Sequence, residues 1–302
     1  MSIRPVKSII QSQPTLEGAG VKLRRAFGFG DSREFDPFLL LDDFRNEHPE
    51  DYLPGFPWHP HRGIETITYV LSGTVHHGDS LGNRGAMGPG DVQWMTAGSG
   101  ILHQEMPKGD ATGRMHGFQL WANLPRALKM TDPRYQDIAS ADIPEVTDDD
   151  GTKVRVICGD FWGKKGPVVG VAADPRYLDI SVPPGKRKSF TVESSRHAFA
   201  YVFAGSGSFR DASAPRSVAT ERVGDGASDD IDFTGNRSLI LFDSGDEITV
   251  QAGPDGIRFL LVSGRPLEEP VAWQGPIVMN TPTELRQAYA ELRDGTFIKQ
   301  RG

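Results

Sequence analysis

The stretch PWHPHRGIETITYVLSG, residues 57–73, places two histidines one residue apart, just before an apolar, strand-like run that ends in glycine. Side chains at positions i and i+2 of an extended segment point to the same side. His59 and His61 can therefore share one metal ion. A single pair of this kind fits a surface turn or hydrogen-bonded histidines equally well.

A second pair with the same spacing favours the metal. In GSGILHQEMP, residues 98–107, His103 and Glu105 again stand two positions apart. The two segments together would supply three imidazoles and one carboxylate, a set that suits Fe, Ni, Cu or Zn better than Mg or Ca. Four ligands on an octahedral ion leave two positions open, and open positions are what catalysis at a metal requires. The sequence therefore predicts one metal site.

The surrounding sequence indicates an all-β fold. Short apolar runs alternate with glycine-rich turns such as DSLGNRGAMGPGD at 79–91, and the chain contains 35 Gly and 22 Pro. This pattern is typical of barrels or sandwiches. A chain of 302 residues is long for one core, so two domains are expected. We place them at residues 1–140 and 152–270, with a linker at 141–151 and a tail at 271–302.

An internal repeat supports the two-domain reading. YVLSG at 69–73 is similar to YVFAG at 201–205, and PGDVQWMTAG at 89–98 is similar to SGDEITVQAG at 244–253. Two similar pairs in the same order indicate two copies of one β-domain. The same alignment places four residues at the ligand positions of the second copy: Thr191, Glu193, Arg258 and Leu260. We therefore expect no metal in the second domain and a contact between Arg258 and Glu193 in its place.

The tail contains one predicted helix, over residues 281–294. Its apolar residues recur at i, i+3, i+4 and i+7 on one helical face: Leu285, Ala288, Tyr289 and Leu292. Thr281 is suited to cap the first turn, Glu284 completes a capping box and Gly295 is placed to end the helix.

Charge and cysteine content limit the possible partners and cellular locations of the protein. The net charge of −7 disfavours binding to a phosphate backbone, so no nucleic-acid partner is expected. Cys158 is the single cysteine, which excludes an internal disulfide. The first residues lack the apolar core of a secretion signal, and the chain has no apolar run of about 18 residues that could span a membrane. A cytoplasmic location is expected.

The two histidine segments resemble the motifs of a known family. HPHRGIETITYVLSG followed by GPGDVQWMTAGSGILHQEMP is similar to the two cupin motifs as they occur in the pirin family. The resemblance continues through FQLWANLP and DPRYQDI to GPIVMNTPTELRQAYAELRDG. It implies two tandem jelly-roll β-barrels, a C-terminal helix that packs back on the N-terminal domain, and a mononuclear metal, usually iron, at His59, His61, His103 and Glu105.

Glu65 is a competing carboxylate, because many cupins ligate their metal through the glutamate of the first motif. It follows His61 by four residues, about 13 Å along a straight strand. Only a bend at Gly63 would bring it to the metal. We therefore expect Glu105 to be the ligand and Glu65 to lie beside the metal or to fill the barrel. Both carboxylates are candidates to accept a proton from a substrate.

The resemblance also implies activities: quercetin 2,3-dioxygenase in some relatives, and regulation of transcription or of partner enzymes in others. The predicted function is a dioxygenase that cleaves quercetin or a related flavonol or enol chelated to one divalent metal. Fe(II) is expected, with Ni, Cu, Mn, Co or Zn as alternatives. The rival is a non-catalytic metalloprotein whose metal state controls binding to a protein partner, such as a transcription factor or a metabolic enzyme. An open apolar cleft over the histidines favours the enzyme, and a sealed one favours the rival.

Overall fold

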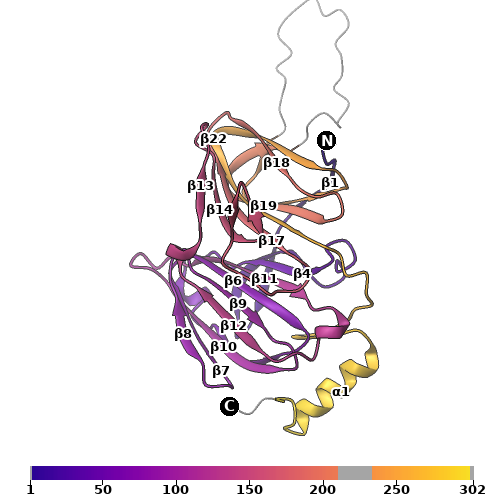
Figure 1. Cartoon of the computed structure of the whole chain (residues 1–302). Coiled ribbons are helices and arrows are strands. Elements are labelled where there is room, and N and C mark those ends of the chain that lie inside the picture. The colour runs from indigo at the N-terminus through magenta and orange to yellow at the C-terminus, as the bar shows by residue number, and fades with distance from the viewer. Residues whose placement is uncertain (1, 210–232, 300–302) are drawn as a thin grey trace, which may run out of the picture. The chain divides into compact units, whose positions relative to one another are not determined.

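The computed structural model describes residues 2–209 and 233–299, which form two compact units (Figure 1). Unit 1 comprises Met1–Gln11, Glu145–Arg155 and Tyr177–Ser263. Unit 2 comprises Ser12–Pro144, Val156–Arg176 and Gly264–Gly302. Each unit is thus assembled from three separate segments of the chain. The boundaries expected from the sequence, at residues 140, 151 and 270, instead divide the chain into consecutive domains.

Unit 2 is built from two antiparallel sheets and two short hairpins. Its strands are β2 (Gln13–Glu17), β3 (Val21–Phe27), β4 (Phe38–Asp43), β5 (Phe56–His61), β6 (Ile64–Ser72), β7 (Thr74–Asp79), β8 (Arg84–Met87), β9 (Val92–Thr96), β10 (Ile101–Lys108), β11 (His116–Asn123), β12 (Arg134–Ile138), β15 (Asp160–Phe161), β16 (Lys164–Lys165), β23 (Ala272–Gln274) and β24 (Ile277–Met279). One sheet has the order β12-β9-β6-β11-β4-β3-β2 and the other the order β5-β10-β7-β8. Side chains of the two sheets meet inside, where Thr68 of β6 donates a hydrogen bond to Glu105 of β10.

The described strands of unit 1 belong to one sheet. Its strands are β1 (Val6–Gln11), β13 (Glu145–Thr147), β14 (Lys153–Cys158), β17 (Arg176–Val182), β18 (Arg187–Thr191), β19 (His197–Ser208), β20 (Thr234–Gly235), β21 (Ser238–Phe242) and β22 (Glu247–Gly264). The main path runs β1-β21-β19-β22-β17-β14-β13, and β18 pairs with β22. Aromatic residues fill the interior, where Phe259 contacts Phe190 and Phe209 edge to face. The predicted all-β fold of two barrels with a C-terminal helix is confirmed.

The repeated segments occupy equivalent places in the two units. YVLSG lies in β6, which pairs with β9, and YVFAG lies in β19, which neighbours β22. The predicted contact of Arg258 is wrong, however. Arg258 makes a bidentate ion pair with Asp179 of β17, at 2.9 and 2.6 Å, and Glu193 pairs with Arg196. The local repeat does not show which strand lies next to Arg258, because strand pairing joins distant segments.

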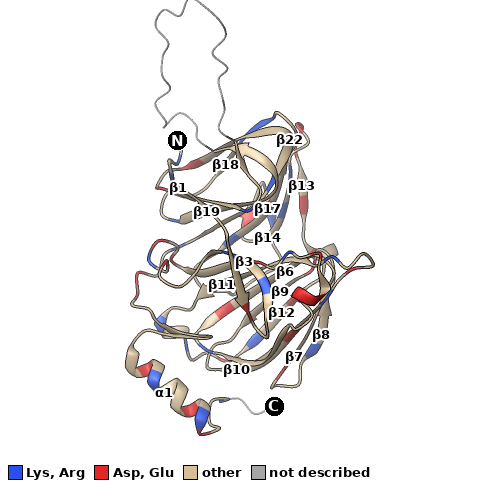
Figure 2. Cartoon of the chain, turned by 180° about the vertical axis from the view of Figure 1, so that it is seen from behind, with Lys and Arg blue, Asp and Glu red and all other residues tan. Residues whose placement is uncertain are grey.

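The tail of unit 2 ends in helix α1 (Pro282–Arg293), the one α-helix among the described residues (Figure 1). The predicted capping box is confirmed: the Glu284 backbone N–H donates to Thr281 Oγ1, and the Thr281 backbone N–H donates to Glu284 Oε2. The helix carries both charge signs (Figure 2). Its acidic residue Glu291 forms a 2.7 Å ion pair with the buried Arg62. The helix is thereby anchored beside the first histidine motif.

Strand β24 lies against the turn between β5 and β6. The Val278 N–H donates to the Arg62 carbonyl at 3.1 Å, and the buried Lys129 ammonium donates to the carbonyls of Gly63 and Val278 at 2.9 and 3.0 Å. Gly63 has φ +76°, and a Cβ atom there would lie 2.0 Å from the Val278 oxygen. Only glycine therefore allows this approach.

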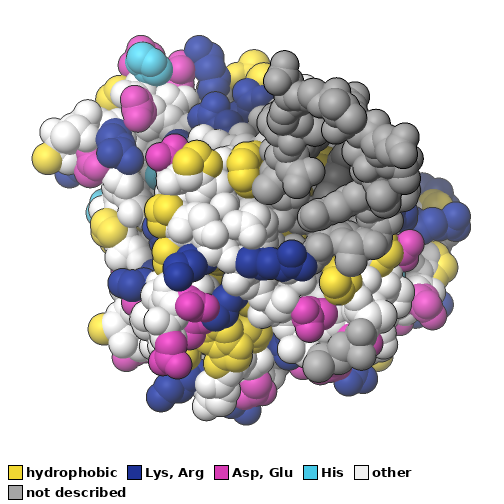
Figure 3. Space-filling model, turned by 90° about the horizontal axis from the view of Figure 1, so that it is seen from above, with side chains coloured by type: hydrophobic (Ala, Val, Ile, Leu, Met, Phe, Trp, Pro, Cys, Tyr) yellow, Lys and Arg dark blue, Asp and Glu magenta, His cyan; other side chains and the backbone are white. Residues whose placement is uncertain are grey.

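The surface shows mixed charge. On the face in Figure 3, Lys and Arg side chains lie among Asp and Glu side chains, and neither sign forms a continuous area outside the undescribed residues. Among the described residues, no helix has the length and apolar character needed to cross a membrane.

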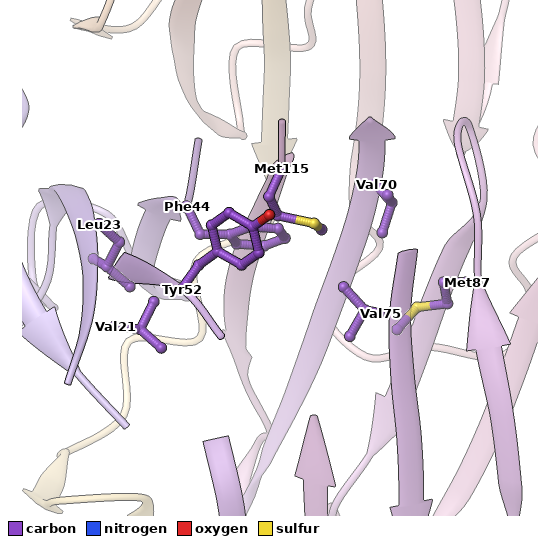
Figure 4. Packing of buried hydrophobic residues seen from close by; sticks show 8 residues of the cluster. All are labelled: Val21, Leu23, Phe44, Tyr52, Val70, Val75, Met87 and Met115. Atoms are coloured by element: carbon purple, nitrogen blue, oxygen red, sulfur yellow. The ribbon is translucent and has the colours of Figure 1, made fainter. Parts of the chain in front are cut away.

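A cluster of buried apolar side chains packs inside unit 2 (Figure 4). Its members come from both sheets and from the loops between them: Val21, Leu23, Phe44, Tyr52, Val70, Val75, Met87 and Met115. Phe56 packs against them. Burial of each large side chain contributes about 1.5–3 kcal/mol. Because Phe44 and Phe56 also line the pocket described below, this core fixes one wall of that pocket.

Replacement of Gly63 by alanine should destabilise unit 2. Left-handed φ costs alanine about 1–2 kcal/mol, and displacement of β24 should bring the total to at least about 3 kcal/mol. We expect the melting temperature to fall by roughly 6–12 °C, measured by circular dichroism. Gly82→Ala is the matched control, because Gly82 has φ +92° with nothing within 4 Å of its added Cβ. Equal melting temperatures for the two variants would contradict the steric argument.

Candidate metal centre

The three predicted histidine ligands meet inside unit 2. His59 and His61 lie on β5, and His103 lies on the neighbouring strand β10, where its Cα is paired with that of His59. One ligand atom of each ring lies within 4.8 Å of the others. The i, i+2 spacing therefore does bring the first pair together, and antiparallel pairing supplies the third ring.

Backbone carbonyls fix the tautomers of the first two rings. His59 Nδ1 lies 2.8 Å from the Pro57 oxygen, and His61 Nδ1 lies 3.1 Å from the Pro276 oxygen. A carbonyl oxygen only accepts hydrogen bonds, so each Nδ1 must carry the proton. Both Nε2 atoms then present lone pairs, and they lie 3.1 Å apart. Two acceptors at this distance repel each other unless a cation lies between them.

His103 lacks any hydrogen-bond partner within the described part of the chain. Both of its ring nitrogens are buried, and neither is bonded. Burial lowers the pKa of His103 well below its usual range, and the neighbouring rings of His61 and His59 lower it further. Burial also lowers the pKa of His59 and of His61. All three rings are therefore neutral at pH 7, the state in which imidazole binds a metal.

These residues fit a divalent transition metal. Two nitrogens bound at about 2.1 Å and at a right angle would lie about 3.0 Å apart, close to the observed 3.1 Å. Nδ1–H donation to a carbonyl is the usual support of a metal-bound histidine. A metal would also satisfy His103, whose buried nitrogens otherwise carry a desolvation cost of about 1–3 kcal/mol.

Glu105 lies close to the histidines in sequence but has its own partners. It is fully buried on β10, and its carboxylate accepts a 3.0 Å hydrogen bond from Thr68. Burial raises the pKa of Glu105 to about 7, against the hydrogen bonds from Thr68 and Gln119, which lower it. Its oxygens are not part of the three-histidine group. Glu105 is nevertheless on the wall of the same pocket as His59 and His61.

The structure does not bring Glu65 to the histidines. Glu65 is paired with Thr96 across β6 and β9, and its carboxylate accepts a 2.7 Å hydrogen bond from the Thr96 hydroxyl. Thr68, three residues along β6, points to the opposite face, where it reaches Glu105. Glu65 thus points away from the barrel interior. Burial raises its pKa.

A pocket of about 420 Å³ is lined by His59 and His61. This volume lies within the usual range for small-molecule sites. Aromatic side chains form much of its wall, among them Phe56, Trp58 and Trp121. Trp121 contacts the His61 ring edge to face, with ring centroids 5.0 Å apart. Trp58 is 54% exposed and stands at the entrance. The pocket is therefore an open, largely apolar cleft.

Sequence reasoning missed three parts of this site. Pro276 orients His61 from the tail, more than 200 residues away, and Arg25 and Asp42 line the pocket as an ion pair. No local motif marks them. Arg25 and Asp42 would be found only from the register of β3 on β4, which puts their Cα atoms opposite each other.

Comparison with known proteins identifies the family. The family model for pirin matches residues 20–122, and the model for the pirin C-terminal cupin domain matches residues 177–298. A pirin-like protein of Caulobacter vibrioides is 44% identical over 298 residues, which cover 98% of this chain and 100% of that protein. The chain belongs to the pirin family. Human pirin is 36% identical over 295 residues, which cover 97% of this chain and 93% of that protein.

Two solved structures are similar to most of the chain. The crystal structure of a quercetin 2,3-dioxygenase from Acinetobacter baumannii matches with a TM-score of 0.85 at 29% identity, covering 98% of this chain and 99% of that chain. A bacterial pirin from Escherichia coli in complex with nickel(II) matches with a TM-score of 0.63 at 20% identity, covering 86% of this chain and 99% of that chain. The second match shows the fold alone.

Removal of one ring should remove the metal. We expect wild-type protein to bind about one divalent ion per chain, and His61→Ala or His103→Ala to weaken the affinity by at least about 100-fold, measured by calorimetric titration with Ni²⁺ or Co²⁺. His76→Ala is the control, because His76 is exposed on the adjacent strand β7. Affinity unchanged in both pocket variants would show that the ion binds elsewhere.

Proposed function

We propose that this pirin-family protein is a metal-dependent dioxygenase that cleaves a flavonol such as quercetin or a related chelating enol. The observation that carries the proposal is the pair of Nε2 lone pairs held 3.1 Å apart by two histidines that line an aromatic pocket. The 29% identity to a quercetin 2,3-dioxygenase over 98% of the chain supports it.

A divalent metal, Fe(II) by the family resemblance, would be held by His59, His61 and His103 and would supply Lewis-acid and redox chemistry. We propose Glu105 as the fourth ligand or as the base that accepts the proton of the substrate hydroxyl. With a pKa of about 7, Glu105 can exchange a proton at neutral pH. Trp58 and Trp121 would hold the substrate rings and exclude water. Glu65, on the other face of β6, is assigned no role in the reaction.

The open pocket favours the enzyme over the regulatory rival. A metalloprotein that only switched a protein interface would need no cleft leading to its metal, whereas a flavonol requires one of this size. The exposed Trp58 ring at the entrance and the aromatic walls match a flat aromatic ligand. The metal-dependent binding of a protein partner remains the alternative if no turnover is found.

Oxygen uptake tests the activity directly. Protein loaded anaerobically with Fe(II) should consume oxygen as quercetin absorbance is lost, and Glu105→Gln should lower kcat by about 100-fold or more, because general base catalysis typically contributes this much. Loading in turn with Mn, Co, Ni, Cu and Zn identifies the active metal. If none of these preparations turns over quercetin or another enol, the dioxygenase proposal fails.

Proton release on metal binding tests Glu105 as a ligand. At pH 6 most Glu105 is protonated, since its pKa is raised to about 7, so binding of Zn²⁺ should release about one proton. At pH 8 the carboxylate is already ionised. Burial holds the pKa of His61 and of His103 well below the usual range and also lowers the pKa of His59, so the histidines oppose this release little. Release should therefore fall toward zero at pH 8.

Calorimetry in buffers of different ionisation enthalpy measures this release. Glu105→Gln should abolish it at pH 6. Glu65→Gln should leave it intact, because Glu65 is equally buried but faces away from the histidines. Equal release at both pH values in wild-type protein would exclude Glu105 as the ligand.

A further inference from the structure

A row of polar side chains crosses the pocket wall opposite the β5 histidines. Arg25 of β3 has its Cα opposite that of Asp42 of β4, and Asp42 is opposite Gln119 of β11. All three residues line the pocket that contains His59 and His61. Neighbouring wall residues on these strands, such as Leu23, Leu40 and Trp121, are apolar or aromatic.

Arg25 and Asp42 form a rigid pair. The guanidinium Nε and Nη2 atoms donate to the two Asp42 carboxylate oxygens, each at 2.8 Å. Nη2 also lies 2.8 Å from a Glu17 oxygen. Within the described residues, Nη1 has no hydrogen-bond partner. The pair therefore has two N–H donors and the second lone pairs of Asp42 left for a ligand.

The Asp42 carboxylate is almost fully enclosed. It is 5% exposed, and burial raises its pKa to about 6, against Arg25, which lowers it. A buried ion pair adds little net stability compared with apolar side chains of similar size. Stability alone thus gives no reason for a fixed ion pair among the apolar side chains of a ligand pocket, whereas recognition of a polar group does.

A single side chain, Trp121, connects the candidate metal centre to the strand segment beside the Arg25 and Asp42 pair. His61 contacts Trp121, and Trp121 follows Gln119 by two residues on β11. Two residues on one strand span about 7 Å, so Gln119 lies about that distance along β11 from Trp121, with Asp42 beside it on β4. A flat ligand anchored at the histidines by one end would bring a distant substituent to Asp42.

We propose that Arg25 and Asp42 form a second recognition site for the substrate, which binds a phenolic hydroxyl remote from the metal-chelating oxygens. A hydroxyl matches the pair because it can donate to Asp42 and accept from Arg25 Nη1. A ligand without this hydroxyl leaves both groups unbonded inside the complex, and sites of this kind discriminate strongly against such analogues. The inference rests on the proposed flavonol substrate.

Quercetin and 3-hydroxyflavone test the second site. Both carry the chelating 3-hydroxyl and 4-carbonyl groups, but 3-hydroxyflavone lacks every other hydroxyl. Binding to full-length protein loaded with redox-inert Zn²⁺, followed by quenching of tryptophan fluorescence, reports affinity without turnover. We expect wild-type protein to bind quercetin at least about 10-fold more tightly than 3-hydroxyflavone.

Two variants then locate the preference. The double variant Arg25→Met, Asp42→Leu removes both charges together, which buried pairs tolerate well, and Asp42→Asn is the smaller change if the double variant does not fold. In either variant the preference should fall below about 3-fold while affinity for 3-hydroxyflavone is retained. Lys22→Gln is the control. Lys22 is on β3, as Arg25 is, but lies outside the pocket, and its exposed side chain pairs with Asp51.

The outcomes separate this inference from the proposed activity. Flavonol binding with the expected preference but without oxygen uptake by any metal form supports the second site and ends the dioxygenase proposal. Oxygen uptake with equal affinity for the two flavonols overturns the second site and leaves the activity standing. A preference that survives in a folded variant, or a wild-type protein that binds neither flavonol, overturns the second site as well.

Discussion

The enforced approach of two imidazole lone pairs is the constraint on which the rest of unit 2 depends. His59 Nδ1–H donates to the Pro57 carbonyl, and His61 Nδ1–H donates to the Pro276 carbonyl. The two unprotonated Nε2 atoms therefore face each other at 3.1 Å. One of these carbonyls comes from the tail. The tail must therefore return to β5, and the structure secures it there by the Gly63 approach to β24, by the Lys129 ammonium and by the Arg62 to Glu291 ion pair. Features that look separate along the chain thus serve one site.

The interior of the same barrel carries a belt of hydrogen-bonding side chains. Its members have their Cα atoms paired from one strand to the next: Arg25 on β3, Asp42 on β4, Gln119 on β11, Thr68 on β6 and Gln93 on β9. Glu105 joins this belt through Thr68. Burial in the barrel raises the pKa of both carboxyl groups, to about 6 for Asp42 and about 7 for Glu105. Because these polar groups are fixed in surroundings of low polarity, one pocket can contain both a carboxyl group that takes up a proton near pH 7, Glu105, and an ion pair that discriminates between ligands, Arg25 with Asp42.

The sequence predicts those parts of the site that depend on local geometry. The i, i+2 spacing places His59 and His61 on one side of β5, where their ligand atoms lie close together. The capping residues of α1 act within one helical turn, and the predicted capping box is confirmed. Parts that depend on pairing between distant strands are not predictable in this way. Arg258 meets Asp179 through the β22 and β17 pairing rather than Glu193. Pairing of β1 with β21 likewise joins residues 6–11 to unit 1, which no pattern within those residues indicates.

The shared role of the tail has a thermodynamic consequence. Metal bound to the Nε2 atoms requires the His61 tautomer that Pro276 stabilises, and Pro276 holds that tautomer only while β24 lies against Arg62 and Gly63. Anything that binds the ordered state more tightly than the state with a displaced tail stabilises the ordered state. If a metal binds these Nε2 atoms, metal binding and tail docking favour each other by the same free energy. Helix α1, with its Glu291 contact to Arg62, extends this coupling to a surface element. The candidate metal centre is thus assembled by segments of unit 2 that lie more than 200 residues apart in the sequence.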